Sequence, residues 1–311
     1  TTIKKLKTNV FDNMVLSFFT IFELLCYTSF SIKRRNVMYQ LIAFDMDGTL
    51  LTSQKTITKS SIAAIDRAHS AGKQVALSTG RSLSELGLYK KDLQGIRYAV
   101  LASGALIYDL EAKCVLAKQT LPAVVVDKVK ALAEAHDLMV VGMINGQGYL
   151  QRSHFENIAN YYMEIYTELY DETAVLVDNI CDLLAKEREN FGKINIYHLT
   201  ADERDQSYEV LLSEDIAMIK SEVSGLELTA QGVEKGQGLA HLAQKLNLPM
   251  EQIIVVGDAD NDESMIREAG FGVAMGNANE NIKGLADIIV ADNDHGGCAQ
   301  AIDDVLLADK I

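Results

Sequence analysis

Two short acidic segments of the sequence could hold a cation. The first, Asp45-Met46-Asp47-Gly48-Thr49-Leu50, places two carboxylates two residues apart, and the second, Gly257-Asp258-Ala259-Asp260-Asn261-Asp262, carries three. Carboxylates this close together need a cation or a shared proton. Mg²⁺ prefers such oxygen ligands and keeps waters that a phosphate can replace, whereas the glycine and glutamate spacing of an EF-hand calcium loop is absent. For one such segment alone, a solvated turn is the alternative, because Asp and Gly favour turns.

Two other segments could hold an anion. Ser78-Thr79-Gly80-Arg81 offers a hydroxyl group and backbone amides, which can bind phosphoryl oxygens, although taken alone a simple turn is the commoner explanation of such a segment. Lys235 lies in Gly232-Val233-Glu234-Lys235-Gly236. A single lysine at a helix start is usually a solvated surface residue, but here the flanking glycines could let it reach the edge of a sheet.

The elements around these segments indicate a parallel α/β sheet. Short apolar runs at 41–44, 75–77, 99–102 and 253–256 are typical of buried parallel strands. Runs at 271–275 and 288–290 predict two more strands, and segments with helical spacing separate them. Ligands bind such sheets at the carboxyl ends of the strands, which is where the acidic segments and Ser78–Arg81 begin. The two acidic segments meet if strands 41–44 and 253–256 are neighbours.

The middle of the chain, residues 122–224, alternates less regularly. It predicts a helix at 127–136, a hairpin around Asn145-Gly146 and strands at 194–199 and 216–220. We therefore predict a Rossmann-like parallel core of residues 38–121 and 225–311, interrupted by an inserted α+β domain of residues 122–224. Four tyrosines of this insert, Tyr161, Tyr162, Tyr166 and Tyr170, stand at roughly helical spacing and suit packing within the insert better than stacking on a substrate.

Composition narrows the classes of function. The chain has 311 residues, 48% of them hydrophobic, and a net charge of −14. This charge repels a nucleic acid backbone, so we expect no nucleic acid partner. The four cysteines are far apart and form no CxxC pair, which indicates neither a zinc site nor a disulfide framework and favours the reducing cytoplasm.

Residues 1–37 differ from the rest of the chain. The 19 residues of 14–32 are mostly apolar and lie between two groups of basic residues, but they include several serines and threonines. A bilayer span needs about 20 predominantly apolar residues, so the membrane signal is marginal. Met38 stands directly before a strong strand and looks like a natural start. We expect 1–37 to be an extension outside the fold; a membrane anchor is the alternative.

The four segments together resemble the motifs of the haloacid dehalogenase (HAD) superfamily of phosphohydrolases. DMDGTL is similar to its first motif, Thr79 to its second, Lys235 to its third and GDADND to its fourth. The combination of LSTGR, GVEKGQGL and GDADND with a large insert between the second and third motifs resembles the Cof-type subfamily with a C2B cap. The resemblance covers about residues 39–307 and implies a parallel core with a cap domain formed by the insert.

The resemblance also implies roles for residues. Asp45 would be the nucleophile that forms an aspartyl-phosphate, and Asp47 the general acid and then the base for water. Thr79 would bind the transferring phosphoryl group, and Lys235 would neutralise it and orient Asp45. The physical chemistry agrees, because phosphoryl transfer needs mainly positioning and charge stabilisation. A carboxylate nucleophile also splits the hydrolysis into two easier steps.

A Mg²⁺ ion would complete the implied site. Its residues would be Asp45, Asp47 through its backbone carbonyl, Asp258 and Asp262, with Asn261 and Asp262 supporting the phosphate and the metal shell. The expected phosphate-binding residues are Met46, Thr79, Gly80, Arg81, Lys235 and Asn261. We therefore predict a Mg²⁺-dependent phosphatase of small phosphomonoesters, sugar phosphates or related metabolites, that is a monomer or a homodimer and has no membrane partner.

Two departures from the family pattern put the substrate in doubt. Many relatives carry Asn-Gly-Ala where this chain has Ser103-Gly104-Ala105, and Asp-Gly-Val where it has His295-Gly296-Gly297-Cys298. Either could alter the substrate pocket or the hinge of the cap. Two alternatives stay open: a sugar phosphomutase of the same superfamily, and a non-catalytic metabolite-binding protein.

Overall fold

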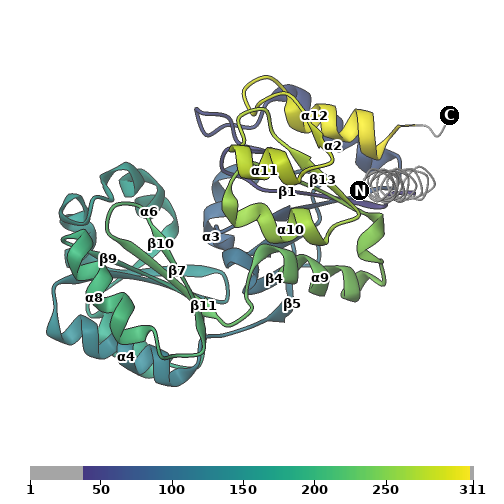
Figure 1. Cartoon of the computed structure of the whole chain (residues 1–311). Coiled ribbons are helices and arrows are strands. Elements are labelled where there is room, and N and C mark those ends of the chain that lie inside the picture. Colours follow the sequence, from purple (N-terminus) through teal and green to yellow (C-terminus); the bar gives the residue numbers. More distant parts are fainter. Residues whose placement is uncertain (1–37, 309–311) are drawn as a thin grey trace, which may run out of the picture.

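The computed structural model describes residues 38–308, and these form two β-sheets, each covered by helices (Figure 1). The larger sheet is built from both ends of the described chain. The smaller sheet and its helices come from the middle, and we call this part, residues 123–230, the cap. The predictions for residues 1–37 lie outside the described residues.

The core sheet has eight strands in the order β14-β13-β12-β1-β2-β3-β4-β5. The pairs from β14 to β3 are parallel, and β4 pairs antiparallel with both of its neighbours, β3 and β5. The strands are β1 (Leu41–Phe44), β2 (Gln74–Ser78), β3 (Tyr98–Leu101), β4 (Leu106–Asp109), β5 (Cys114–Lys118), β12 (Ile253–Gly257), β13 (Phe271–Ala274) and β14 (Ile288–Ile289). β1 and β12 are fully buried, which explains why both read as uninterrupted apolar runs.

Helices cover both faces of the core sheet. They are α2 (Lys59–Ser70), α3 (Leu83–Leu86), α9 (Lys235–Leu246), α10 (Glu263–Glu268), α11 (Glu280–Leu285) and α12 (Gly297–Ala301), which continues as a π-helical turn at Ile302–Leu306. α2 begins at Thr58, whose hydroxyl accepts a hydrogen bond from the Ser61 amide at 3.1 Å. α9 ends at Asn247 in the left-handed conformation, which stops the helix before Pro249.

The cap has a six-stranded sheet in the order β10-β11-β9-β6-β7-β8. Its strands are β6 (Leu138–Ile144), β7 (Gln147–Gln151), β8 (Ala174–Val177), β9 (Phe191–His198), β10 (Ile216–Ser221) and β11 (Gly225–Ala230). Its helices are α4 (Ala123–Ala135), α5 (Arg152–Glu156), α6 (Thr167–Thr173), α7 (Ile180–Lys186) and α8 (Ala201–Leu211). α4, α7 and α8 bury one face of this sheet in an apolar cluster.

The predicted end of the insert at residue 224 is wrong. β11 (Gly225–Ala230) pairs with β10 and β9, so it lies inside the cap sheet and not in the core. The sequence of residues 225–230 alternates apolar and polar side chains, unlike the uninterrupted apolar runs of β1 and β12, but only the pairing partners decide to which sheet a strand belongs. The chain therefore returns to the core between Ala230 and Lys235, where α9 begins.

The core sheet also ends in an antiparallel hairpin that sequence reasoning missed. β4 and β5 extend the sheet beyond β3, and β5 leads directly into the cap. β5 lies at the sheet edge and is largely exposed, so it lacks the apolar run that marks the central strands. No helix within residues 38–308 is both long and apolar enough to cross a bilayer.

Candidate active site

The two acidic segments meet because β1 and β12 are neighbours in the sheet. Phe44 lies opposite Val256, and the Asp45 amide donates a hydrogen bond to the Val256 carbonyl at 3.0 Å. Each strand then ends, and its acidic segment begins at the same edge. As a result, carboxylate oxygens of Asp45, Asp258 and Asp262 all lie within 4.8 Å of one another.

Asp262 braces this cluster. Its side chain is fully buried, and its Oδ2 accepts hydrogen bonds from the backbone amides of Asp258 at 2.8 Å and Ala259 at 3.2 Å. Its Oδ1 accepts from Lys235 Nζ at 2.6 Å. Both carboxylate oxygens are therefore engaged by the protein, and Asp262 shapes the loop that presents Asp258.

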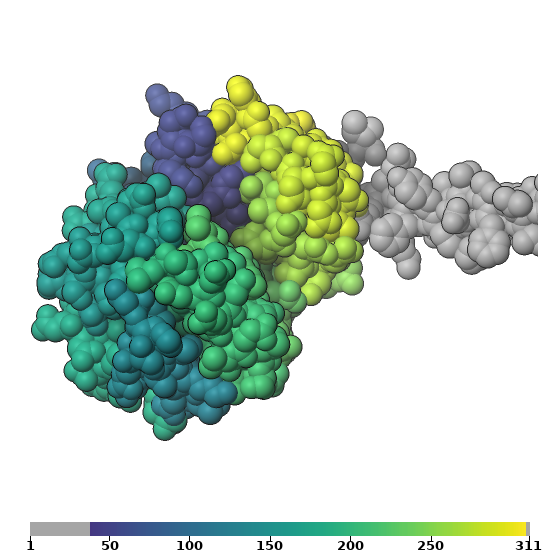
Figure 2. Space-filling view, turned by 60° about the vertical axis from the view of Figure 1, so that its left-hand side comes forward, coloured from purple at the N-terminus to yellow at the C-terminus, as the bar shows by residue number. Residues whose placement is uncertain are grey.

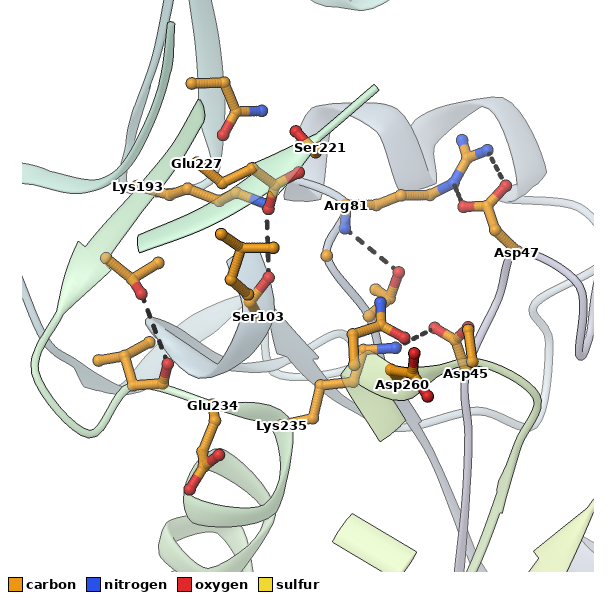
Figure 3. A pocket seen from close by; sticks show the side chains of 18 of the residues that line it. Asp45, Asp47, Arg81, Ser103, Lys193, Ser221, Glu227, Glu234, Lys235 and Asp260 are labelled. Carbon is orange, nitrogen blue, oxygen red and sulfur yellow. Dashed lines mark hydrogen bonds and ion pairs between the residues drawn. The ribbon is translucent and has the colours of Figure 1, made fainter. Parts of the chain in front are cut away.

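Lys235 is the first residue of α9 and is almost completely buried. Its Nζ lies 2.6 Å from Asp45 Oδ1 and 2.6 Å from Asp262 Oδ1, so it bridges the two acidic segments (Figure 3). Burial by itself lowers the pKa of Lys235, but the two carboxylates more than offset this and raise it. The lysine is thus a fixed positive charge inside the cluster.

The donor set fits a divalent cation. Three carboxylates face one ammonium group, which leaves negative charge uncompensated in a buried site. Burial raises the pKa of Asp45 to about 8, although Lys235 opposes the effect. Burial likewise raises the pKa of Asp258 to about 6, against the hydrogen bond that Thr49 donates to its Oδ1 at 2.7 Å. Hard oxygen donors at a sheet edge are what Mg²⁺ takes.

Gly48 is required beside Asp258. Its φ is +79°, and a Cβ at this position would lie 2.3 Å from Asp258 Oδ2. Any side chain would therefore displace the carboxylate as well as strain the backbone.

We expect Gly48→Ala to lower the phosphatase activity that the motifs predict on the order of 10²-fold, since a displacement of about 1 Å at a reacting centre costs that much. Gly72→Ala is the matched control, because Gly72 also has a positive φ, +73°, but nothing lies within 4 Å of its added Cβ. Gly72→Ala should lose only the stability that the backbone strain costs and keep its activity, whereas Gly48→Ala should also lose activity. Equal activity of the two variants would contradict the placement of Asp258.

Asp47 points away from the cluster. Its carboxylate accepts from Arg81 Nε at 2.7 Å and Nη2 at 2.9 Å, and it lies 2.7 Å from Lys55 Nζ. Burial would raise the pKa of Asp47, but the bonds to Arg81 and Lys55 outweigh it and hold the pKa well below its usual range. The Asp47 side chain is therefore not one of the clustered carboxylates, and a metal contact through its backbone carbonyl stays a prediction.

The turn after β2 lies beside Asp47. Thr79 is buried there, and its Oγ1 accepts from the Arg81 amide at 3.2 Å. The Nη1 of Arg81 is buried but has no hydrogen-bond partner among the described residues, so one donor is left for a ligand. Thr79, Gly80 and Arg81 all line the same pocket.

Asn261 and Met46, the two other predicted phosphate-binding residues, differ in whether their side chains can reach a ligand. Asn261 lines the pocket, and it is exposed. The Met46 side chain, by contrast, is fully buried in the core. Met46 can therefore contact a phosphate only through its backbone, and its side chain has a structural role.

A cavity of about 780 Å³ joins these residues to the cap. Figure 2 shows a recess between the surface of the cap (teal and green) and that of the core (purple and yellow). The cap contributes a wall that sequence reasoning missed, notably Lys193, Asn195 and Glu227. A signal existed: polar residues 193, 195 and 197 alternate with Ile194 and Ile196, the pattern of a strand with one polar face.

The structure shows where the four cap tyrosines and the two departures from the family pattern lie relative to the cavity. Tyr161 packs in a cap cluster, but Tyr166 and Tyr170 line the cavity, and the four tyrosines do not share one helix. Ser103 also lines the cavity, with a φ of +60°, and its Oγ accepts a hydrogen bond from Lys193 at 3.4 Å. The segment at His295–Gly297 does not line it, so this departure does not alter the pocket wall.

The sequence matches one family over most of its length. The model of the haloacid dehalogenase-like hydrolases matches residues 42–302. A 5-amino-6-(5-phospho-D-ribitylamino)uracil phosphatase of Bacillus subtilis, YcsE, is 30% identical over 88% of this chain and 98% of its own. The pyridoxal phosphate phosphatase YbhA of Escherichia coli is 29% identical over 85% of this chain and 97% of its own.

Solved structures agree with this match. A haloacid dehalogenase-like hydrolase from Bacteroides thetaiotaomicron superposes with a TM-score of 0.75 at 27% identity, covering 86% of this chain and 99% of its own. The HAD subclass IIB sugar phosphatase BT4131, at 22% identity, shares the fold with a TM-score of 0.70 over 85% of this chain and 98% of its own. The chain therefore belongs to the haloacid dehalogenase-like hydrolases and is a phosphohydrolase of the Cof type.

Proposed function

We propose that this phosphatase is Mg²⁺-dependent, hydrolyses small phosphorylated metabolites and works through an aspartyl-phosphate on Asp45. The observation that carries the proposal is the buried cluster in which Lys235 holds Asp45 beside Asp258, with the pocket opening over it. The relatives support the substrate size, because YcsE and YbhA are named for small phosphate esters.

In the first step, the Asp45 carboxylate attacks phosphorus while Asp47 gives a proton to the departing oxygen. Lys235 keeps Asp45 oriented, and the Thr79 hydroxyl and Arg81 Nη1 bind phosphoryl oxygens. In the second step, Asp47 takes a proton from water, the water attacks phosphorus, and the Asp45 carboxylate is restored. A Mg²⁺ ion bound by Asp45 and Asp258 would offset the charge between the carboxylates and the phosphoryl group.

Asp47 needs a change of partners to act as an acid, since Arg81 and Lys55 hold its pKa low in the structure described here. An entering phosphoryl dianion competes for both cations. As they turn toward the phosphate, Asp47 loses the interactions that favour its charged form, and its pKa rises. Substrate binding would thereby convert Asp47 into a proton donor only when a phosphate is present.

The pocket favours hydrolysis over the phosphomutase alternative. A mutase must bind a second phosphate, which needs cations beyond those that serve the first. Arg81 and Lys235 serve the first phosphate in the steps above, and the two other cations that line the pocket among residues 38–308 have carboxylate partners: Lys193 with Glu227 and Arg267 with Glu263.

The activity is tested with the full chain and a panel of phosphorylated metabolites, together with p-nitrophenyl phosphate. We expect phosphate release with Mg²⁺ and none in excess EDTA, with activity restored when Mg²⁺ is returned. A sugar bisphosphate should not be needed as an activator. Full turnover in EDTA would contradict the metal requirement, and dependence on a bisphosphate would favour a mutase.

Metal binding should also appear in thermal stability. Without metal, the folded protein keeps a proton on Asp258 below about pH 6 and on Asp45 below about pH 8, because the pKa values of both groups exceed those of the unfolded chain. These groups therefore contribute stability at low pH that is lost as the pH rises through 6 and 8. A metal ion must displace the protons, so Mg²⁺ should raise the Tm little at pH 5 and most at pH 8.

The controls for this measurement are two asparagine variants in one loop. Asp258→Asn should abolish the effect of Mg²⁺ on the Tm. Asp260→Asn removes the same charge, but the Asp260 carboxylate bonds Asn279 and Asn281 and lies outside the cluster, so the effect should persist. A Mg²⁺ effect that is independent of pH, or that survives in Asp258→Asn, would contradict the site.

A further inference from the structure

A row of polar side chains on β9 faces the pocket. Lys193, Asn195 and Tyr197 lie on one face of this strand, and each is more than nine-tenths buried. Ile194 and Ile196 point to the opposite face, where they pack against the cap helices. Burying three polar groups in a row costs stability unless each finds a hydrogen-bond partner.

Lys193 has partners on both sides of the cavity. Its Nζ forms an ion pair with Glu227 Oε2 at 2.6 Å, on the neighbouring strand β11, and donates to Ser103 Oγ of the core at 3.4 Å. A Cβ on Gly80 would lie only 3.7 Å from this Nζ. The polar row therefore reaches the turn that carries Thr79, so a phosphate held there would point its ester group toward the cap.

The side-chain amide of Asn195 has a hydrogen-bond partner for its nitrogen but none for its oxygen among the described residues. Its Nδ2 donates to the Tyr197 hydroxyl at 3.3 Å, whereas its Oδ1 is buried and accepts no hydrogen bond from any described residue. The Oγ of Ser221, on β10, is buried and unpartnered as well and lines the same cavity. Buried polar atoms are almost always satisfied, so both atoms are explained if a ligand supplies the missing hydrogen bonds.

The charged residues that line the pocket determine which leaving groups can bind against this row. Nine carboxylates and four cations line the pocket, and each cation is paired. Figure 3 shows Lys193 meeting Glu227 at one side of the pocket and Lys235 meeting Asp45 at the other. A leaving group with its own negative charge would face surplus carboxylates, while hydroxyl or amino groups would find acceptors.

We propose that Asn195, Glu227 and Ser221 form the subsite for the leaving group, and that this subsite takes neutral or cationic leaving groups rich in hydrogen-bond donors. The inference rests on the proposed function, because the phosphoryl end must be held at Thr79 and Asp45. It assigns the specificity to the polar row of β9 and its neighbours, and Asn195 is its central acceptor.

The test compares three esters of similar size: glucose 6-phosphate, glucosamine 6-phosphate and 6-phosphogluconate. Each is measured as a substrate and as a competitive inhibitor of p-nitrophenyl phosphate hydrolysis, so slow substrates are also ranked. We expect the neutral and the cationic esters to bind at least about tenfold better than the acid, because an uncompensated charge in a polar site is strongly rejected.

Variants of Asn195 then locate the subsite. Asn195→Leu keeps the size but removes the acceptor, so the ratio of glucose 6-phosphate to p-nitrophenyl phosphate activity should fall roughly ten- to a hundredfold. Asn195→Asp keeps an acceptor and adds charge, and should shift the preference toward glucosamine 6-phosphate. Asn190→Leu makes the same exchange just before β9, outside this cavity, and should leave the ratio as it is.

The outcomes separate the two proposals. Absence of p-nitrophenyl phosphate turnover by the unmodified chain with Mg²⁺ would overturn the proposed function and this inference with it. Turnover with equal or better binding of 6-phosphogluconate would overturn the inference alone, because it would place a donor, and not the Asn195 oxygen, against the ligand. An unchanged ratio in Asn195→Leu would overturn it too.

Discussion

Asp45→Asn should abolish phosphate release from every ester, with a loss on the order of 10⁴- to 10⁶-fold, the size expected when a nucleophile is removed. The amide keeps the shape of the carboxylate but cannot attack phosphorus. No phosphoenzyme should form, which mass spectrometry of rapidly acid-quenched protein will check. Folding should survive, because Lys235 keeps its ion pair with Asp262 at 2.6 Å and one buried carboxylate is gone.

The matched control for this variant is Asp260→Asn. It removes one negative charge from the same pocket, yet the Asp260 side chain bonds only to Asn279 and Asn281 among the described residues. Its turnover should stay close to that of the unmodified chain. If Asp45→Asn acquired a phosphoryl label, or if both variants lost activity equally, Asp45 would not be the nucleophile.

Asp47→Asn should fail in a different way. It keeps the nucleophile but loses the proton donor, so sugar phosphates, whose alkoxide leaves poorly, should be hydrolysed roughly 10²- to 10⁴-fold more slowly. p-Nitrophenolate leaves without a proton, so this ester should still phosphorylate Asp45. The second step then stalls, because no base activates water, and the aspartyl-phosphate should accumulate as a mass gain of one phosphoryl group.

The two leaving groups serve as internal controls for Asp47→Asn. Equal slowing of both esters would mean that Asp47 acts through structure, for example by orienting Arg81, with which it shares two hydrogen bonds. Lys55→Met supplies a further comparison, since it removes one cation from Asp47 and leaves Arg81 in place. It should change the rate on sugar phosphates less than Asp47→Asn does, because the proton donor remains.

The pKa of Asp47 is low in the free protein, which limits its role as a proton donor. Arg81 and Lys55 hold its carboxylate in the charged form, which suits a base and not an acid. If a phosphoryl group draws both cations away, one carboxylate can serve in both steps. In the free protein, Asp47 would stay deprotonated even at pH values where an ordinary aspartate takes up a proton. Bound substrate would raise the pKa of Asp47 and so let it carry the proton.

Much of this protein follows from sequence alone because its central elements are buried in simple ways. β1 and β12 lie inside a parallel sheet with helices on both faces, so each is an uninterrupted apolar run that ends at its acidic segment. The order and spacing of the four motifs along the chain are also what makes them recognisable. The α/β core, the inserted cap and the meeting of the two acidic segments at one sheet edge were therefore predictable, whereas the catalytic roles stay predictions.

Only the tertiary structure could decide which residues meet across elements. The sequence of β11 does not say to which sheet the strand belongs, and its place in the cap depends on pairing with β9 and β10. Likewise, the ion pair of Asp47 with Arg81 and the contact of Lys193 with Ser103 join residues 34 and 90 positions apart. Local patterns carry no information on such pairs, because they arise when distant segments pack together. The place of Asn195 in the wall of the pocket is decided in the same way, by how the cap sits on the core.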